Sequence, residues 1–170
     1  LFDFNSVTAS QVMVPRVRIV GIKLGTLPAD IRRIVAEHRR TRYAVYDGDL
    51  DHIVGMVHAK DLLRHLIEER PVTAASVRRI PFVPEGASGD DVLGVLQAAL
   101  AHMAWVVDEH GGTAGIVGLE DLFEEVVGEI DEGSGGPVQL YRDAAGRLRV
   151  RGTLRIDELG QEFHLDLEHE

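Results

Sequence analysis

The chain has 170 residues, 45% of them hydrophobic, which is enough to bury a core in one or two compact domains. It contains no cysteine, which excludes disulfide bonds and thiolate metal sites. The formal net charge of −10 argues against a nucleic acid or an anionic lipid surface as the main partner, because both would repel the chain. The acidity instead permits cations or basic partners.

The hydrophobic segments are too short to cross a bilayer. The stretch 98–107 is without formal charge and even contains His102, whereas a membrane span needs roughly 20 apolar residues. The chain starts at Leu1 rather than at a methionine and stops at Glu170 inside a patterned segment. We therefore expect it to be a piece of a longer protein.

The first half of the chain predicts a mixed α and β unit. Ser6 or Thr8 caps a short helix that runs to Met13, and a β-rich stretch follows at 17–24. Apolar residues then recur at helical spacing after Pro28, which suits the first position of an amphipathic helix. Strands at 43–46 and 53–57, joined by a turn, form a predicted antiparallel hairpin before the next helix.

An internal repeat is the most informative feature of the chain. The segments 53–63 and 113–123 share a glycine, Gly55 or Gly115, and a carboxylate about one helical turn after a short apolar run, Asp61 or Asp121. The stretches 80–83, 92–100, 105–108, 115–117 and 119–127 retrace the element order of the first unit. We expect two half-units related by a pseudo-twofold axis, neither of which folds well alone.

The C-terminal segment has a different residue pattern from the two repeats. After the glycine-rich spacer 133–137, alternating residues at 138–142 and 147–151 predict a β-hairpin. Thr153 is a candidate cap for a last short helix. This element is too small for a stable core of its own, so we interpret it as the start of a truncated domain.

Four motifs together resemble one known family. They are Val12-Met-Val-Pro-Arg16, Tyr43-Ala-Val-Tyr-Asp47, Gly115-Ile-Val-Gly-Leu-Glu-Asp121 and the acidic helix Leu122-Phe-Glu-Glu-Val-Val-Gly-Glu-Ile130. They look like the paired CBS domains of the CorC/HlyC family, also called hemolysin-like or cyclin M-type proteins. The acidic helix directly after the second repeat is a trait of that family beyond the general CBS pattern.

The resemblance implies an α+β fold of tandem CBS repeats, a Bateman module in which each repeat is a small sheet packed with two helices. Its boundaries would be residues 1–68 and 77–130 for the repeats, 131–137 for a linker and 138–170 for the start of a transporter-associated domain. That last domain is described in the family as similar to a flavin-binding fold. Its truncation here argues against bound FAD.

The resemblance also implies a function and its setting. The chain would be a cytosolic regulatory module, at the cytoplasmic face of the plasma membrane, of a magnesium or cobalt efflux protein whose transmembrane domain lies upstream. Two such pairs would associate into a flat homodimer, for which apolar helices such as 62–67 offer surfaces.

The repeat itself suggests an adenine nucleotide site. A carboxylate near a helix start accepts hydrogen bonds from ribose hydroxyls, while the helix N-terminus favours a phosphate, so Asp61 and Asp121 are candidates. Nucleotide-binding CBS repeats usually carry Ser or Thr three residues earlier, where this chain has His58 and Gly118. Gly118 removes a side-chain donor, and His58 either donates to a phosphate or occludes the pocket.

Other residues are candidates for the base and the phosphates. Tyr43 in the first repeat, or Trp105 in the second, would help to form an adenine slot, although core packing is the better interpretation of Trp105. Arg42 and Arg16 are candidates to neutralise phosphates, with solvated surface charge as the alternative for each.

Acidic residues at the second helix start bear on metal binding. Glu120 and Glu124 would repel phosphates unless a divalent cation intervenes, which predicts nucleotide binding that depends on Mg²⁺. The alternative is that these carboxylates simply face water, and it has the stronger support, because Leu122, Phe123 and Val126 form the buried stripe of that helix.

Three functional hypotheses follow. The first is a module that senses adenine nucleotide, most simply ATP with Mg²⁺, and passes the signal on through its dimer arrangement. The second is a structural dimerisation module with empty clefts. The third is an enzyme, such as a phosphohydrolase, but the chain offers no evident nucleophile or positioned base, so we expect no catalysis.

Overall fold

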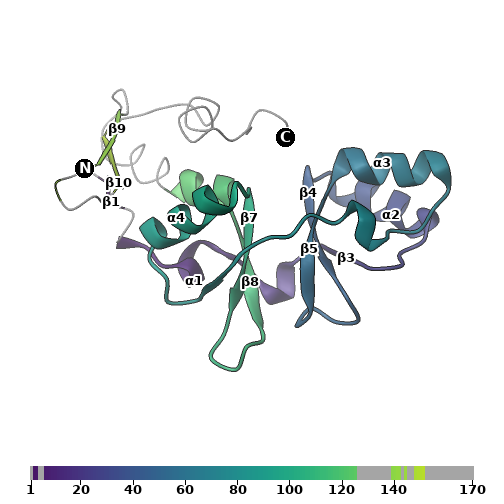
Figure 1. The fold of residues 1–170 in the computed structure, drawn as a ribbon, viewed down its shortest axis with the longest axis horizontal. Helices are drawn as coiled ribbons and strands as arrows, with labels where there is room; N and C mark the ends of the chain where they lie inside the picture. The colour runs from purple at the N-terminus through teal and green to yellow at the C-terminus, as the bar shows by residue number, and fades with distance from the viewer. Residues whose placement is uncertain (1, 4–5, 126–138, 143, 145–147, 152–170) are drawn as a thin grey trace.

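The computed structural model describes residues 2–3, 6–125, 139–142, 144 and 148–151. Two lobes stand side by side, with their sheets toward the middle and their long helices on the outer sides (Figure 1). None of the helices in these described ranges is long and apolar enough to span a membrane.

The first lobe is a three-stranded sheet covered by two helices. Its order is β3-β4-β5, with β3 parallel to β4 and β4 antiparallel to β5. The elements are β3 (Gly21–Lys23), α2 (Pro28–His38), β4 (Arg42–Tyr46), β5 (Ile53–His58) and α3 (Ala59–Glu68). Pro28 takes the first turn of α2, as predicted, because a proline at that position loses no intrahelical hydrogen bond.

The second lobe repeats this arrangement and adds one strand. Its sheet has the order β2-β8-β7-β6, again with a parallel pair and an antiparallel hairpin. The elements are β2 (Val14–Pro15), β6 (Phe82–Pro84), α4 (Gly89–Ala99), β7 (Met103–Val107), β8 (Thr113–Gly118) and a helical segment at 119–125. The predicted α+β fold of tandem repeats is confirmed.

Each lobe is completed by a segment that precedes the other one in sequence. Val7 and Ala9, at the start of α1 (Ala9–Val12), are buried in the core of the second lobe, and β2 pairs with β8. Val72 is buried in the core of the first lobe, and Arg78 forms a β-bridge with Met56 after the short helix η3 (Ala74–Ser76). The two lobes are therefore interlocked, consistent with the expectation that neither half folds well alone.

The paired glycines make this crossing possible. A Cβ added at Gly115 would clash with the carbonyl oxygen of Val14 and lie 2.6 Å from the Met13 sulfur. A Cβ at Gly55, where φ is +156°, would clash with the carbonyl oxygen of Arg78 and lie 2.7 Å from Val77 Cγ1. At both positions the repeated glycine leaves room for the backbone of the segment that completes its lobe.

The prediction of a β-rich stretch at 17–24 is mostly wrong. Residues Arg16–Arg18 form the 3-10 helix η2, and only Gly21–Lys23 are extended in a ladder. The physical reason is topological, because residues 16–20 carry the chain from β2 in one sheet to β3 in the other.

The predicted C-terminal hairpin is confirmed, and it gains a third strand. β9 (Gln139–Arg142) pairs with β10 (Leu148–Arg151), and β1 (Phe2–Asp3) adds to the far side of β10. The expected linker 131–137 and the helix capped by Thr153 lie outside the described residues.

Candidate functional site

A cavity of about 260 Å³ lies between the two lobes, and we call it the inter-repeat cavity. Its walls combine apolar, basic and acidic side chains. The apolar part comes from Val14, Ile19, Val20, Ala44, Met103 and Ile116. Both sheets and the crossing segment 14–20 contribute, so the cavity exists only when the two repeats are assembled.

The first repeat supplies the basic wall. Arg39 and Arg40, after the end of α2, and Arg42, at the start of β4, line the cavity. Alternation along β4 places Arg42 and Ala44 on the cavity side. Tyr43 lies between them and is fully buried in the core, where its hydroxyl accepts a hydrogen bond from the Arg40 N–H (2.9 Å).

The second repeat supplies the acidic wall. Gly118 precedes the helical segment 119–125, and its N–H donates to Oδ2 of Asp121 (2.9 Å). A Cβ at Gly118 would lie 3.0 Å from that same oxygen, so a side chain there would crowd the carboxylate. Glu120 and Glu124 line the cavity beside Asp121.

One ion pair connects the two walls. Arg42 Nη1 lies 3.3 Å from Glu120 Oε1, and the two side chains are only 13% and 15% exposed. His102 Nδ1 lies 3.9 Å from the same Glu120 oxygen, and its side chain is 16% exposed. Screening by water is weak at this exposure, so the charges interact more strongly than a surface pair would.

The equivalent helix start in the first repeat is built differently. His58 is the N-cap of α3, and its Nδ1 accepts a hydrogen bond from the Lys60 N–H (3.0 Å). Partial burial, together with the positive charges of Arg42 and Lys60, lowers the pKa of His58 below its usual range. A neutral ring suits the cap, because protonating Nδ1 would remove the acceptor.

Asp61 does not line the inter-repeat cavity. It lies in a separate cavity of about 380 Å³ between α3 and the segment 70–78, which we call the α3 cavity. Its carboxylate is 3.9 Å from the Arg78 guanidinium. The structure thus brings Asp121, Gly118 and Arg42 together and leaves Asp61 and His58 outside that group.

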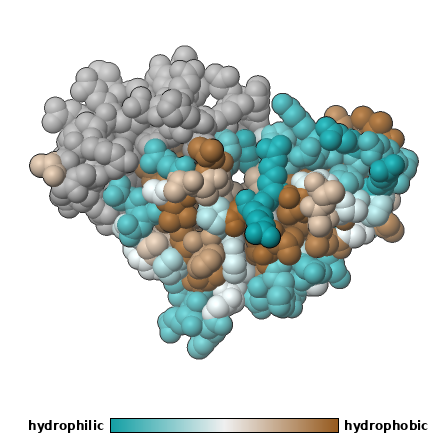
Figure 2. Space-filling model, viewed as in Figure 1, coloured by the Kyte–Doolittle hydropathy of each residue, from teal (hydrophilic) through white to brown (hydrophobic). Residues whose placement is uncertain are grey.

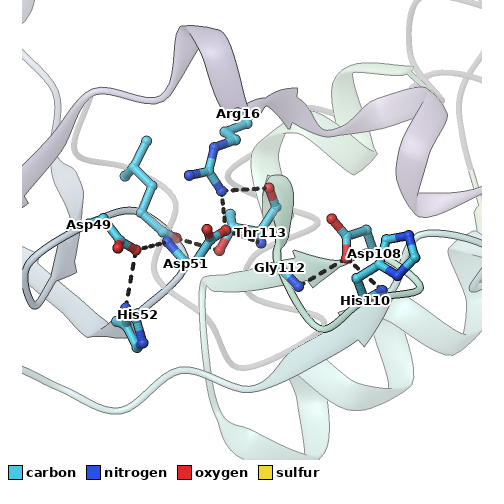
Figure 3. Close-up of polar contacts among 9 residues, drawn as sticks. Arg16, Asp49, Asp51, His52, Asp108, His110, Gly112 and Thr113 are labelled. Carbon is cyan, nitrogen blue, oxygen red and sulfur yellow. Dashed lines mark hydrogen bonds and ion pairs between the residues drawn. The ribbon is translucent and has the colours of Figure 1, made fainter.

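Arg16 is also absent from the lining of the inter-repeat cavity. Its guanidinium pairs with Asp51 and donates to the backbone oxygen of Thr113 (3.3 Å), as Figure 3 shows. The Thr113 N–H donates to Asp51 Oδ1 (3.0 Å), and these contacts lower the pKa of that carboxyl. Arg16 therefore joins the hairpin loops of the two repeats.

The remaining candidates concern the base and the metal. Trp105 is partly buried, and its ring lies tilted against that of the exposed Phe82, with ring centroids 5.7 Å apart and an interplanar angle of 54°. It does not line the inter-repeat cavity. Within the described residues, no group of three or more His, Asp or Glu side chains is placed to hold a metal ion. The predicted metal ligands Glu120 and Glu124 both line the inter-repeat cavity.

Sequence reasoning missed several lining residues. Val14, Ile19 and Val20 lie in the crossing segment, and the sequence gives no sign that this segment returns to the second sheet. His102 immediately precedes β7, and Met103 opens that strand. Met103 pairs with Gly118 as Arg42 pairs with His58, so the strand register makes Met103 and Arg42 equivalent. Alignment of the two repeats on Gly55 and Gly115 is one residue out of step at this strand and matches Met103 with Tyr43 instead, so it would not have identified Met103.

Comparison with known proteins agrees with this architecture. The CBS domain family matches the chain twice, over residues 9–68 and 72–128. Two solved structures are similar across both repeats. The CBS domain of a bacterial CNNM/CorC family Mg²⁺ transporter in complex with ATP is 41% identical, with a TM-score of 0.67 over 74% of this chain and 90% of that one. A CBS-domain pair with bound AMP from Klebsiella pneumoniae is 31% identical, with a TM-score of 0.60 over 71% and 98%.

Curated relatives give the same assignment. The UPF0053 protein YhdP of Bacillus subtilis is 32% identical over 100% of this chain. A protein named possible hemolysin C from Rickettsia akari is 38% identical over 78% of it. The chain spans 40% and 44% of the lengths of these two relatives. The chain therefore belongs to the CBS-domain family, as a tandem pair of the type found in hemolysin C and CNNM/CorC proteins.

Proposed function

We propose that this CBS pair senses adenine nucleotide, as a complex with Mg²⁺, in the inter-repeat cavity. The observation that carries the proposal is the composition of that cavity. Three arginines of one repeat, the helix start of the other repeat with Asp121, and several apolar side chains line this one cavity. Guanidinium groups suit phosphates, and a carboxylate suits ribose hydroxyls. The related pairs that hold ATP and AMP support the same ligand class.

The residues present fit a nucleoside better than a smaller anion. The cavity of about 260 Å³ is slightly smaller than usual small-molecule pockets, which measure roughly 300 Å³ and above. Val14, Ile19 and Ile116 offer an apolar surface for a base, and Asp121 is positioned by its hydrogen bond from Gly118. Tyr43 and Arg16 are not included in the proposed site, because the cavity lining does not contain them.

Magnesium would enter with the phosphates. Glu120 and Glu124 are two carboxylates on one helix face, which is fewer ligands than a metal ion needs from protein alone. Mg²⁺ usually keeps several waters and is bound by one or two carboxylates together with substrate phosphates. When bound, the ion would neutralise charge between the phosphates and the acidic wall.

The proposal extends to the parent protein. By its relatives, the chain would act as a cytosolic module, at the inner face of the plasma membrane, that regulates a magnesium or cobalt efflux protein without catalysis of its own. It would do so as a homodimer, because Leu63 and Ile67 expose 57% and 75% of their surface on α3. Figure 2 shows this hydrophobic surface over α3, and such patches mark protein contacts.

Calorimetric titration tests the proposal. We expect saturable binding of ATP with Mg²⁺, weaker binding of ADP and AMP, and a loss of ATP affinity when Mg²⁺ is chelated. Analytical ultracentrifugation of the same samples should show a dimer. Absence of heat and of any thermal shift with all three nucleotides, with and without Mg²⁺, would contradict the proposal. A dimer that binds no nucleotide would then support the structural dimerisation module.

A further inference from the structure

Positive and negative charges are separated along this chain. Thirteen of its 18 Lys and Arg residues lie between positions 16 and 79, and none lies between 80 and 141. The part of the second lobe at 80–125 therefore carries carboxylates without a single Lys or Arg, and the segment 7–15, which completes the lobe, adds no charge. The carboxylates belong to Glu85, Asp90, Asp91, Asp108, Glu109, Glu120, Asp121, Glu124 and Glu125. A surface of one charge sign attracts a partner of the opposite sign.

The C-terminal hairpin supplies that opposite charge within the same chain. The segment 139–151 contains four arginines and a single acidic residue, Asp143. The arginines are Arg142, Arg147, Arg149 and Arg151. The first lobe is rich in arginine and would repel this segment, whereas the second lobe would attract it. Of the two lobes, the second is therefore the one that matches the hairpin in charge.

Strand β1 holds the hairpin close to the second lobe. β1 pairs with β10, with Asp3 opposite Arg149, and neighbouring strands lie about 5 Å apart (Figure 1). Four residues after Asp3, Val7 is buried in the second lobe, where its carbonyl oxygen accepts a hydrogen bond from the Gly89 N–H (2.9 Å). Four residues of extended chain span at most about 14 Å. The hairpin backbone is thus tethered near the start of α4.

The surface beside this attachment is both acidic and hollow. Asp90 and Asp91 lie in the first turn of α4. Together with Gly94, Gln97 and Ala98 they help to line a cavity of about 470 Å³ along that helix, which we call the α4 cavity. Asp91, Gly94 and Ala98 are exposed. A basic segment held at the start of α4 therefore meets a concave acidic surface.

We propose that the basic C-terminal hairpin docks on the acidic second lobe at the α4 cavity, with β1 as its tether. The contact is intramolecular, and it is independent of the proposed nucleotide function. Single ion pairs at a surface are weak, but a short tether raises the effective concentration of the hairpin to about the millimolar range. Docking would hold the start of the C-terminal domain against the lobe that carries Asp121.

Paramagnetic broadening of NMR signals tests the docking. The chain has no cysteine, so one introduced thiol takes the only spin label. Gly86→Cys puts the label beside the start of α4, because an added Cβ there has no atom within 4 Å and Gly86 does not line the α4 cavity. Ala36→Cys, on the exposed side of α2 in the first lobe, is the matched control. At low salt the label at position 86 should broaden the amide signals of β9 and β10, and the label at position 36 should not.

Charge reversal separates docking from the tether alone. Arg149→Glu with Arg151→Glu reverses charge on the hairpin, and Asp90→Lys with Asp91→Lys reverses it on α4. Either pair of substitutions should restore most of the signal that the label at position 86 removes, because like charges then face each other. All four substitutions together should bring the broadening back, because the charges are complementary again.

Two controls accompany the reversal. Arg33→Glu with Arg64→Glu reverses as much charge on the first lobe and should leave the broadening unchanged. Salt at about 1 M, where the Debye length is about 3 Å, should weaken the broadening without any change to the hairpin. The amide shifts of β9 and β10 show whether the hairpin stays folded in each variant.

The outcomes decide between docking and its alternatives. The inference is overturned if the label at position 86 leaves β9 and β10 unaffected, or if the broadening survives both charge reversal and salt. Broadening that arises only between a labelled chain and a second, isotope-enriched chain would assign the α4 cavity to another copy, and it too would overturn the inference. Restored broadening in the variant with all four substitutions supports it. No nucleotide is present in these experiments, so each outcome leaves the nucleotide function to its own test.

Discussion

The two helix starts of this duplicated chain follow equivalent strands, β5 and β8, but carry different side chains. The first reads His58-Ala-Lys-Asp61 and is followed by Arg64, whereas the second reads Gly118-Leu-Glu-Asp121 and is followed by Glu124. In the first, a histidine ring caps the helix. In the second, the carboxylate of Asp121 accepts a hydrogen bond from the Gly118 N–H.

The surroundings of the two starts differ as well. Asp121 faces the inter-repeat cavity, where the other repeat supplies arginines, whereas Asp61 lines the α3 cavity between its own helix and the segment 70–78. The backbone pairing, in contrast, is the same in both repeats. The register of the hairpin shifts at equivalent positions, between Val45 and Tyr46 in the first repeat and between Val106 and Val107 in the second. The two repeats thus share their strand register, whereas the residues at their helix starts differ.

The largest effects on stability are expected at the glycines that the two repeats share, Gly55 and Gly115. Gly115→Ala and Gly55→Ala each place a methyl group against a crossing backbone, and each should lower the free energy of unfolding by about 3 kcal/mol. Gly94→Ala is the matched control, because it lies inside α4 with no atom within 4 Å of the added carbon. It should raise stability by about 0.5–1 kcal/mol. Urea unfolding measures all three, and equal effects at positions 94 and 115 would refute the close approach.

A smaller effect, on the pH dependence of stability, is expected at His58, where the two repeats differ. Its pKa is lowered in the folded state, so between the usual value of about 6.5 and that lower value the unfolded chain binds more protons. Stability contributed by the neutral ring is therefore complete above pH 7 and decreases as the pH falls through about 6.5.

Replacing His58 with a residue that caps but does not titrate isolates this effect. His58→Asn keeps a preferred N-cap, so its stability should fall less between pH 7.5 and pH 5.5 than that of the wild type. Urea unfolding at both pH values is the measurement. Parallel decreases in the two proteins would show that His58 does not titrate in this range.

Much of the fold was predictable from the sequence because the repeat constrains it. Gly55 and Gly115 mark equivalent strands, Pro28 marks the start of α2, and the alternation around Tyr43 marks a buried strand. These are local signals, and the sheet and helix geometry follows from them. Asp121 and Gly118 were candidates because of the repeat, and Arg42 was one as a cation for phosphates. The structure places all three around one cavity, and their role in binding stays a prediction.

What the sequence did not predict depends on contacts between distant segments. Arg16 is close in sequence to cavity residues, yet it pairs with Asp51 because the crossing segment leaves β2 beside the hairpin loops. Tyr43 is adjacent to Arg42, but strand alternation turns it into the core. The position of Arg16 cannot be derived from local spacing, because it depends on how the two sheets face each other. Alternation places Arg42 and Tyr43 on opposite faces of β4, and the tertiary structure decides which of these faces is the core.

Titration of ATP with Mg²⁺ into Asp121→Asn and Asp61→Asn is the most direct test of the difference between the two helix starts. Both variants keep an oxygen acceptor and lose one charge, and thermal melts establish that each is folded. We expect Asp121→Asn to weaken binding by about 10-fold to 100-fold, as for a lost hydrogen bond to a charged group, and Asp61→Asn to leave it within about twofold. Equal losses in both variants, or a loss confined to Asp61→Asn, would contradict the assignment of nucleotide binding to the inter-repeat cavity.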